Sequence, residues 1–293
     1  METLRSTATN HDWAEEYREI QRLRAEPDSS RYWDGRAPSF AVGAQERGPY
    51  VERFLRLAGI REGESVLDMG CGAGTLAVPL GREGHEVIAA DFSQGMLAQL
   101  AQTLSERGIE TVRPVRMSWQ DDWHAAGVGS NCVDVAVASR SAVTDDMLES
   151  FRKLSDAARR RVCITVPTSS FPRAQDAMVD AMGLACADVR EHLYALLIAV
   201  QAGFAPELSY IESRHVDTFD SFDEAFAELA RVADAASSLA GRASSEPARE
   251  ALRSWLAGNL VDNPDHDPNA PRAGRLRLRD ERIVRWAFIS WDV

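Results

Sequence analysis

The sequence of 293 residues lacks the spacings that metal sites and disulfide frameworks need. Its four cysteines are far apart, with no C-x-x-C pair, and its six histidines show no H-x-x-x-H spacing. We therefore predict no metal site and no disulfides, and we expect the thiols to be buried. The cysteines are Cys71, Cys132, Cys163 and Cys186.

Long apolar runs and an excess of positive charge are also missing. No run approaches the roughly 18 apolar residues that indicate a membrane span, and the N-terminus has acids where a signal peptide has a basic and then an apolar stretch. The formal net charge of −12 opposes broad attachment to nucleic acid or to an anionic membrane, because phosphate binding depends on clustered Lys and Arg. We expect a cytoplasmic protein with a small-molecule partner, no nucleic acid and no membrane.

What the sequence does contain is an alternation of apolar strands and helices. A hydrophobic content of 45% supports one large core plus an accessory part. Strands that alternate with helices imply a parallel sheet with right-handed crossovers, buried on both faces. Ligands of such sheets bind at the carboxyl ends of the strands. The first predicted strand begins at residue 66 and leads into a glycine loop, with Asp68 at the junction. The other predicted strands are 86–91, 112–117, 133–139, 161–167 and 208–213, and the predicted helices between them are 75–83, 94–107, 145–158, 174–184 and 189–202.

A glycine loop with an acid before it follows the first strand. The segment 66–75 reads VLDMGCGAGT, so Gly70 and Gly72 fit the first two positions of the dinucleotide motif G-x-G-x-x-G, but Thr75 replaces its third glycine. A glycine loop that opens a helix normally binds phosphate, yet Asp68 would repel a pyrophosphate. The loop therefore favours a cationic ligand such as S-adenosylmethionine.

A second acid ends the next strand. Asp91 lies 23 residues after Asp68, close to the separation at which a Rossmann-type unit places a carboxylate on a ribose. A ribose is common to dinucleotides and S-adenosylmethionine, so Asp91 alone does not distinguish them. Ser93 is placed to cap the helix 94–107, which Gly108 ends, and Thr144 or Asp145 is placed to cap the helix 145–158.

These residues resemble the first motif of class I S-adenosylmethionine-dependent methyltransferases of the small-molecule type. The resemblance implies a doubly wound, mostly parallel seven-stranded α/β sheet with helices on both faces. It also implies S-adenosylmethionine as cofactor and in-line methyl transfer to an N, O, S or C nucleophile without a metal. In the family, the acid at the position of Asp91 binds the ribose diol, and the side chain that follows it often packs on adenine. The candidate cofactor-binding residues are Asp68, Gly70, Cys71, Gly72, Asp91, Phe92, Met96, Ser118, Trp119, Ser139, Trp33, Arg36 and Phe40.

Two loops beyond the motif carry open alternatives. Where the family commonly has an Asp on the adenine amino group, this chain has Ser118-Trp119-Gln120. Trp119 either stacks on adenine or packs over the sheet edge. After the fourth strand, Ser139 precedes Arg140, which either faces an acidic acceptor or forms a surface ion pair with Asp145 or Asp146.

The two ends of the chain are accessory segments. Residues 1–60 are predicted to form a helical lid before the core at 61–215, because Trp33, Arg36 and Phe40 resemble the W-x-x-R-A-x-x-Y/F entry of small-molecule methyltransferases; the alternative is a helix docked on the sheet. Residues 216–274 are predicted to be an inserted helical subdomain near the acceptor pocket, or alternatively a dimerisation arm of a homodimer. Residues 275–293 are predicted to be C-terminal strands that complete the sheet.

We weigh three other functions against methyl transfer. An NAD-dependent oxidoreductase is disfavoured by Asp68 and the missing glycine. Only a measurement of turnover distinguishes a methyltransferase from a non-catalytic S-adenosylmethionine-binding protein. An amino-methylating nucleic-acid enzyme would show a D/N/S-P-P-Y/F/W motif after the fourth strand, which is absent. We name no catalytic base, because no motif surrounds the available side chains. These are His124, His192, Tyr194 and His215.

Overall fold

The fold is given by a computed structural model of the chain. Of the predicted site residues, Arg36 and Phe40 lie outside the part of the chain that the structure describes, as does Cys186. The described residues are 11–23, 30, 32–35, 37, 48–168, 176–184, 190–239, 245–268 and 273–293.

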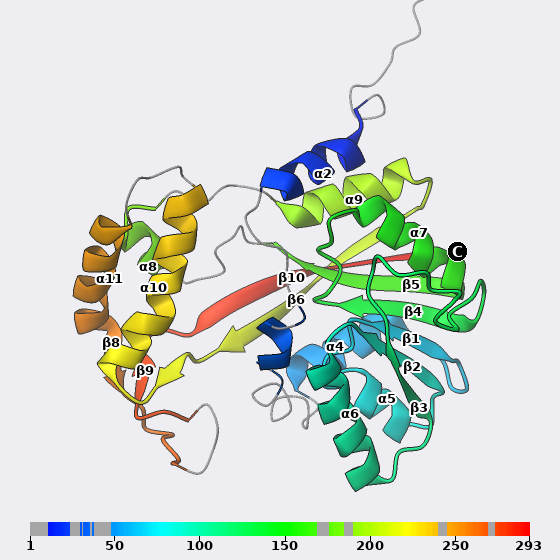
Figure 1. The fold of residues 1–293 in the computed structure, drawn as a ribbon, viewed down its shortest axis with the longest axis horizontal. Helices are drawn as coiled ribbons and strands as arrows, with labels where there is room; N and C mark the ends of the chain where they lie inside the picture. Colours follow the sequence, from blue (N-terminus) through cyan, green and yellow to red (C-terminus); the bar gives the residue numbers. More distant parts are fainter. Residues whose placement is uncertain are drawn as a thin grey trace, which may run out of the picture. The chain divides into compact units, whose positions relative to one another are not determined.

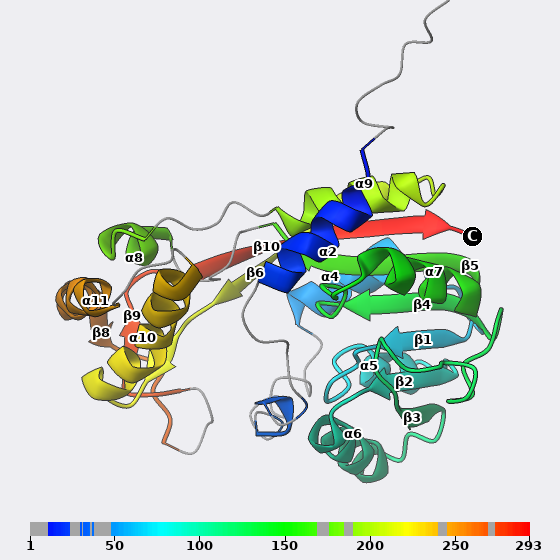
Figure 2. The same ribbon diagram turned by 45° about the horizontal axis from the view of Figure 1, so that its top comes forward.

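A seven-stranded sheet forms the centre of the fold, with strand order β3-β2-β1-β4-β5-β10-β6 (Figure 1). Neighbouring strands from β3 to β5 are parallel, and β10 runs opposite to β4 (Figure 2). This is the predicted doubly wound sheet with an antiparallel strand that completes it. The strands are β1 (Val66–Met69), β2 (Val87–Asp91), β3 (Val112–Arg116), β4 (Val133–Ser139), β5 (Ala158–Pro167), β6 (Glu207–His215) and β10 (Arg282–Asp292).

Helices cover both faces of this sheet. On one side, α5 (Ala77–Arg82) and α6 (Gln94–Arg107) contact β2 and β3, and on the other α7 (Met147–Ala157) contacts β4 and α9 (Glu191–Gln201) (Figures 1 and 2). Burial on both faces explains why β1 is apolar except for one acid, and why all of its residues are buried. Strand β3 lies at one of the two edges of the sheet, which agrees with the placement of a proline within it.

The helix ends follow local capping chemistry. The Ser93 side chain accepts the N–H of Met96 at the start of α6, and Gly108, with φ of 61°, ends the helix, both as predicted. The cap of α7 was predicted wrongly as Thr144 or Asp145. The carboxylate of Asp146 caps this helix instead, by accepting the N–H of Glu149.

The N-terminal helix docks on the α7 side of the sheet. Helix α2 (Trp13–Leu23) contacts α7 and α9, and its residues Ala14 and Tyr17 are buried in the main core. Helix α2 is therefore docked on the core, and the lid stays a prediction for the segment around Trp33. A second helix, α4 (Pro49–Ala58), buries Tyr50 and Phe54.

The contacts divide the chain into two compact units, one of Met1–Val166, Glu191–Ile211 and Trp286–Val293, and one of Pro167–Arg190 and Glu212–Arg285. The second unit contains three helices with a core of their own and a small antiparallel sheet of order β7-β9-β8. Its elements are α8 (Asp176–Ala181), α10 (Phe222–Leu239), α11 (Glu246–Asn259), β7 (Thr218–Phe219), β8 (Leu260–Asp262) and β9 (Leu276–Leu278).

This division differs from the predicted boundaries at residues 216 and 274. The second unit is not purely helical, and β9 does not complete the main sheet: it pairs with β7 and β8, and only β10 joins the seven strands. The reason is length, because β7 and β8 have two and three residues and produce no readable periodicity.

Candidate cofactor site

The loop after β1 depends on three glycines in left-handed conformation. Gly70, Gly72 and Gly74 have φ of 75°, 55° and 96°, a region that residues with a Cβ adopt only at a cost. A Cβ on Gly70 would lie 2.3 Å from the Cβ of Ser141, and one on Gly74 would lie 2.6 Å from Leu100 Cδ1. The spacing G-x-G-x-G is therefore the pattern that this backbone requires.

Asp68 is a buried carboxyl group without a complete set of partners. It is 1% exposed, and its Oδ2 atom has no hydrogen-bond partner. Burial, and then the charge of Asp91, raise its pKa to about 7, while the N–H of Ala77 and the charge of Arg140 act in the opposite direction. A desolvated carboxyl group with a free oxygen favours a cation or a strong hydrogen-bond donor beside it.

Asp91 connects the end of β2 to the glycine loop. Its Oδ2 accepts the N–H of Gly72 at 2.8 Å, and its Oδ1 accepts the N–H of Ser93 at 2.9 Å. Burial raises its pKa as well. The predicted pair of carboxylates thus lies at one edge of the sheet, since β1 and β2 are parallel neighbours.

Part of the predicted lid lies on this loop. The Trp33 side chain packs with Ala37, Ala73 and Met96. Asp34 Oδ1 accepts the Ser93 hydroxyl at 2.6 Å and the backbone N–H of residue 95 at 2.9 Å. The structure therefore brings Trp33 and Met96 together with the loop.

The other residues of the motif lie next to these groups. Phe92 is half-buried directly after β2. The Cys71 thiol is buried, and burial raises its pKa well above the ordinary value. Cys163 is buried as expected, whereas Cys132 is only partly buried, and all three are free thiols.

Trp119 packs against Trp123 and the main core. Its ring lies 5.6 Å from that of Trp123, centroid to centroid, and its carbonyl accepts Lys153 Nζ at 2.8 Å. The N–H of Ser118 donates to Asp121 Oδ2 at 2.8 Å. These contacts match the packing alternative for Trp119, and a contact of Ser118 or Trp119 with adenine stays a prediction.

A polar cluster that the sequence did not indicate lies at the ends of β4 and β5. The Tyr50 hydroxyl is 2.8 Å from both Ser139 Oγ and Thr165 Oγ1, and the N–H of Arg140 donates to Thr165 Oγ1 at 2.9 Å. Tyr50 comes from α4, far from the motif in sequence, so no spacing pointed to it. Ser139 is thereby fixed at the carboxyl end of β4.

The ion pair considered for Arg140 is not formed. Asp146 pairs with Arg18 at 3.1 Å instead, and the guanidinium carbon of Arg140 lies 4.6 Å from the centroid of the Tyr50 ring. The ion-pair alternative was therefore wrong for Arg140, because the adjacent aromatic ring holds its side chain.

The side chains considered as bases have structural contacts. The Tyr194 hydroxyl donates to Glu16. Burial, and then this hydrogen bond, raise the pKa of Tyr194 to about 12. His124 lies 3.5 Å from Asp156 on the surface. Neither group is placed at the glycine loop by these contacts, so we assign no base.

Two features are absent from the described residues: a cluster of metal-ligating side chains and a helix able to span a membrane. Among the described residues, no group of three or more His, Cys, Asp or Glu side chains is arranged to hold a metal ion. Within the same ranges, no helix combines the length and the hydropathy needed to cross a membrane.

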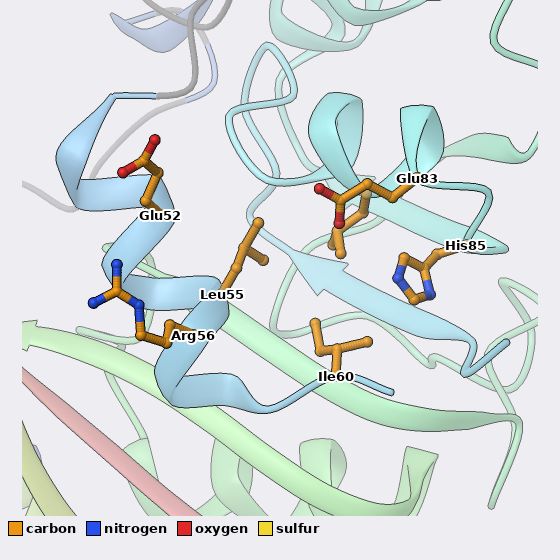
Figure 3. Close-up of a pocket in the computed structure, with 7 residues that line it drawn as sticks. Glu52, Leu55, Arg56, Ile60, Glu83 and His85 are labelled. Atoms are coloured by element: carbon orange, nitrogen blue, oxygen red, sulfur yellow. The ribbon is translucent and has the colours of Figure 1, made fainter. Parts of the chain in front are cut away.

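A pocket at the amino edge of the sheet, before β2, is separate from the glycine loop (Figure 3). It is lined by Glu52, Leu55, Arg56, Ile60, Leu80, Glu83 and His85.

Comparison with known proteins identifies the family. Residues 66–161, which hold the glycine loop and both carboxylates, match the family model described as methyltransferase domain. This part of the chain is a methyltransferase domain. The chain is 32% identical over 182 residues to an uncharacterized protein of Haemophilus influenzae, a match that covers 62% of this chain and 66% of the relative.

Two more comparisons cover different extents of the chain. It is 32% identical over 105 residues to nocamycin O-methyltransferase of Saccharothrix syringae, covering 35% of this chain and 36% of that protein. The chain thus spans 66% or less of the length of these curated relatives. The crystal structure of the YcgJ protein of Bacillus subtilis matches with a TM-score of 0.51 and 12% identity, over 83% of this chain and 97% of that one, and shows the same fold.

Proposed function

We propose that this chain transfers a methyl group from S-adenosylmethionine to a nucleophile on a small-molecule acceptor. The observation that carries the proposal is the buried Asp68 carboxyl group, whose Oδ2 atom has no partner beside a loop of left-handed glycines. S-adenosylmethionine brings an ammonium group and a sulfonium, and so supplies the positive charge that this carboxyl group favours.

The residues of the loop fit the remaining parts of the cofactor. Each Asp91 oxygen accepts one backbone N–H and keeps a further acceptor position, which suits the two hydroxyls of a ribose. Gly70, Gly72 and Cys71 would border the methionine part, and Phe92 and Met96 the adenosine. Trp33, with Arg36 and Phe40 beside it in sequence, would cover the site and exclude water.

When bound, S-adenosylmethionine supplies an electrophilic methyl group on a positively charged sulfur. The protein's contribution is then to align that methyl group with the acceptor, because fixed orientation removes much of the entropy cost of their encounter. A general base is needed only where the acceptor must first lose a proton.

The acceptor class follows from charge. A net charge of −12 disfavours nucleic acid, whose phosphates need clustered basic side chains. The relative named nocamycin O-methyltransferase supports a small organic acceptor as well. A homodimer built through residues 216–274 stays a prediction for the oligomeric state.

The test is a pair of measurements on the full chain. Calorimetric titration with S-adenosylmethionine, S-adenosylhomocysteine and NADH reads the cofactor, and NADH binding without S-adenosylmethionine binding would overturn the proposal in favour of an oxidoreductase. Incubation with methyl-labelled S-adenosylmethionine and a metabolite extract then reads turnover. Cofactor binding without any labelled product identifies the non-catalytic alternative.

A further inference from the structure

Arg140 is held in an unusual position at the carboxyl end of β4. Its φ of 63° lies in the left-handed region, which only two described residues other than glycine adopt. Its N–H donates to the buried Thr165 hydroxyl at 2.9 Å, and this bond fixes the backbone there. A non-glycine residue in this conformation costs free energy, and such residues concentrate at functional sites.

The guanidinium group lies against two aromatic rings. Its carbon is 4.6 Å from the Tyr50 centroid and 5.9 Å from the Trp286 centroid. Tyr50 is itself held by its bonds to the Ser139 and Thr165 hydroxyls. Stacking on fixed rings restricts the guanidinium plane and leaves its N–H donors at the rim, which suits a planar, two-oxygen acceptor.

No ion pair within 4 Å is found for Arg140 in the described part of the chain, although its charge acts on the buried Asp68 carboxyl group. Two other arginines form ion pairs, Arg18 with Asp146 and Arg159 with Asp134. Arg140 is exposed to solvent. An exposed guanidinium that is oriented by aromatic rings and forms no ion pair favours an anion beside it.

The position relative to the cofactor loop identifies which anion. Strand β4 pairs directly with β1, with Asp68 opposite Val137, so Arg140 follows β4 at the edge where the loop lies. We infer that Arg140 binds a carboxylate group of the methyl acceptor against the rings of Tyr50 and Trp286. This inference rests on the proposed function, and it restricts the acceptor to carboxylic acids. The methionine part of the cofactor also carries a carboxylate, so the test must separate the two sources.

The first arm compares wild type with Arg140→Met and with Arg53→Met, an exposed arginine on α4 that loses the same charge. Binding of benzoate and of its neutral analogue benzamide is titrated with and without saturating S-adenosylhomocysteine. We expect wild type and Arg53→Met to bind benzoate at least about tenfold more tightly than Arg140→Met does, and benzamide binding to be equal in all three. Equal benzoate affinity in the three proteins, or no benzoate binding by wild type, overturns the inference.

The second arm titrates S-adenosylhomocysteine and methylthioadenosine, which lacks the amino-acid part. We expect neither affinity to fall in Arg140→Met. A loss confined to S-adenosylhomocysteine would assign Arg140 to the cofactor's carboxylate and overturn the acceptor assignment. Circular dichroism spectra and unfolding curves verify that each variant is folded. If wild type binds neither nucleoside, the proposed function fails, whereas the benzoate arm without nucleoside still reports on Arg140 separately.

Discussion

The carboxylate of Asp91 accepts the backbone N–H of Gly72 at 2.8 Å. The acid that ends β2 therefore holds the glycine loop that follows β1, and the two sequence motifs form one hydrogen-bonded unit. The remaining acceptor capacity of the carboxylate is available to a ligand on the loop.

Replacing Asp91 with alanine should lower the affinity for S-adenosylhomocysteine by at least about tenfold, because charge-assisted hydrogen bonds contribute about 1.5 to 3 kcal/mol each. Calorimetric titration measures the change. Glu110→Ala, at an exposed acid, is the matched control. Unchanged affinity in a folded Asp91→Ala variant would refute the ribose role.

Asp68 should make the stability of the ligand-free protein depend on pH. Its pKa is raised from 3.8 to about 7 in the folded chain, so between these values the folded state binds more protons than the unfolded state. The free energy of unfolding should then fall as the pH rises from about 4 to about 7, by up to about 4 kcal/mol from this group. Above pH 7 this contribution should be constant.

The comparison that isolates Asp68 is urea unfolding of wild type and Asp68→Asn between pH 5 and pH 8. We expect the variant to gain stability relative to wild type as the pH rises. We also expect it to bind S-adenosylmethionine more weakly than wild type does. A stability difference that is the same at every pH would contradict the raised pKa. Cofactor binding should also release a proton at pH 6, detectable as a heat that varies with the ionisation enthalpy of the buffer.

Gly70 and Gly63 separate backbone strain from steric conflict. Both have positive φ, 75° and 80°, but only a Cβ on Gly70 meets another atom, at 2.3 Å from Ser141 Cβ. Gly63→Ala should cost about 1 to 2 kcal/mol of stability, and Gly70→Ala distinctly more. Denaturant unfolding measures both. Equal losses would show that the loop accommodates the methyl group without conflict.

Asp34 tests whether the segment around Trp33 covers the cofactor. Its Oδ1 accepts hydrogen bonds from Ser93 and Gly95. Removing them with Asp34→Ala should speed the dissociation of S-adenosylhomocysteine about fivefold, the equivalent of about 1 kcal/mol. Stopped-flow tryptophan fluorescence gives the rate, with Glu110→Ala again as control. An unchanged rate would mean that this segment is not a lid.

Short-range chemistry made much of the fold predictable. Helix α6 has the predicted bounds because Ser93 and Gly108 cap it locally, and β4 has its predicted bounds because its residues are apolar and buried on both faces. The glycine loop was predictable for the same reason, since each of its glycines has a positive φ that favours glycine at that position.

Long-range pairing was not predictable in this way. The sequence does not show that Tyr50 reaches Ser139 and Thr165, because three separate elements meet there. The sheet partner of β9 depends likewise on two strands too short to recognise. One local contact was not predictable either: Trp119 meets Trp123, four residues on, through a loop conformation that no motif specifies.

The buried Cys71 thiol has a consequence for oxidative stress. A thiolate is the species that peroxides and alkylating reagents attack. At 4% exposure and with a pKa well above its ordinary value, Cys71 holds almost no thiolate at neutral pH. The loop proposed to hold the methyl donor therefore contains a sulfur atom that is protected from redox inactivation by its own surroundings.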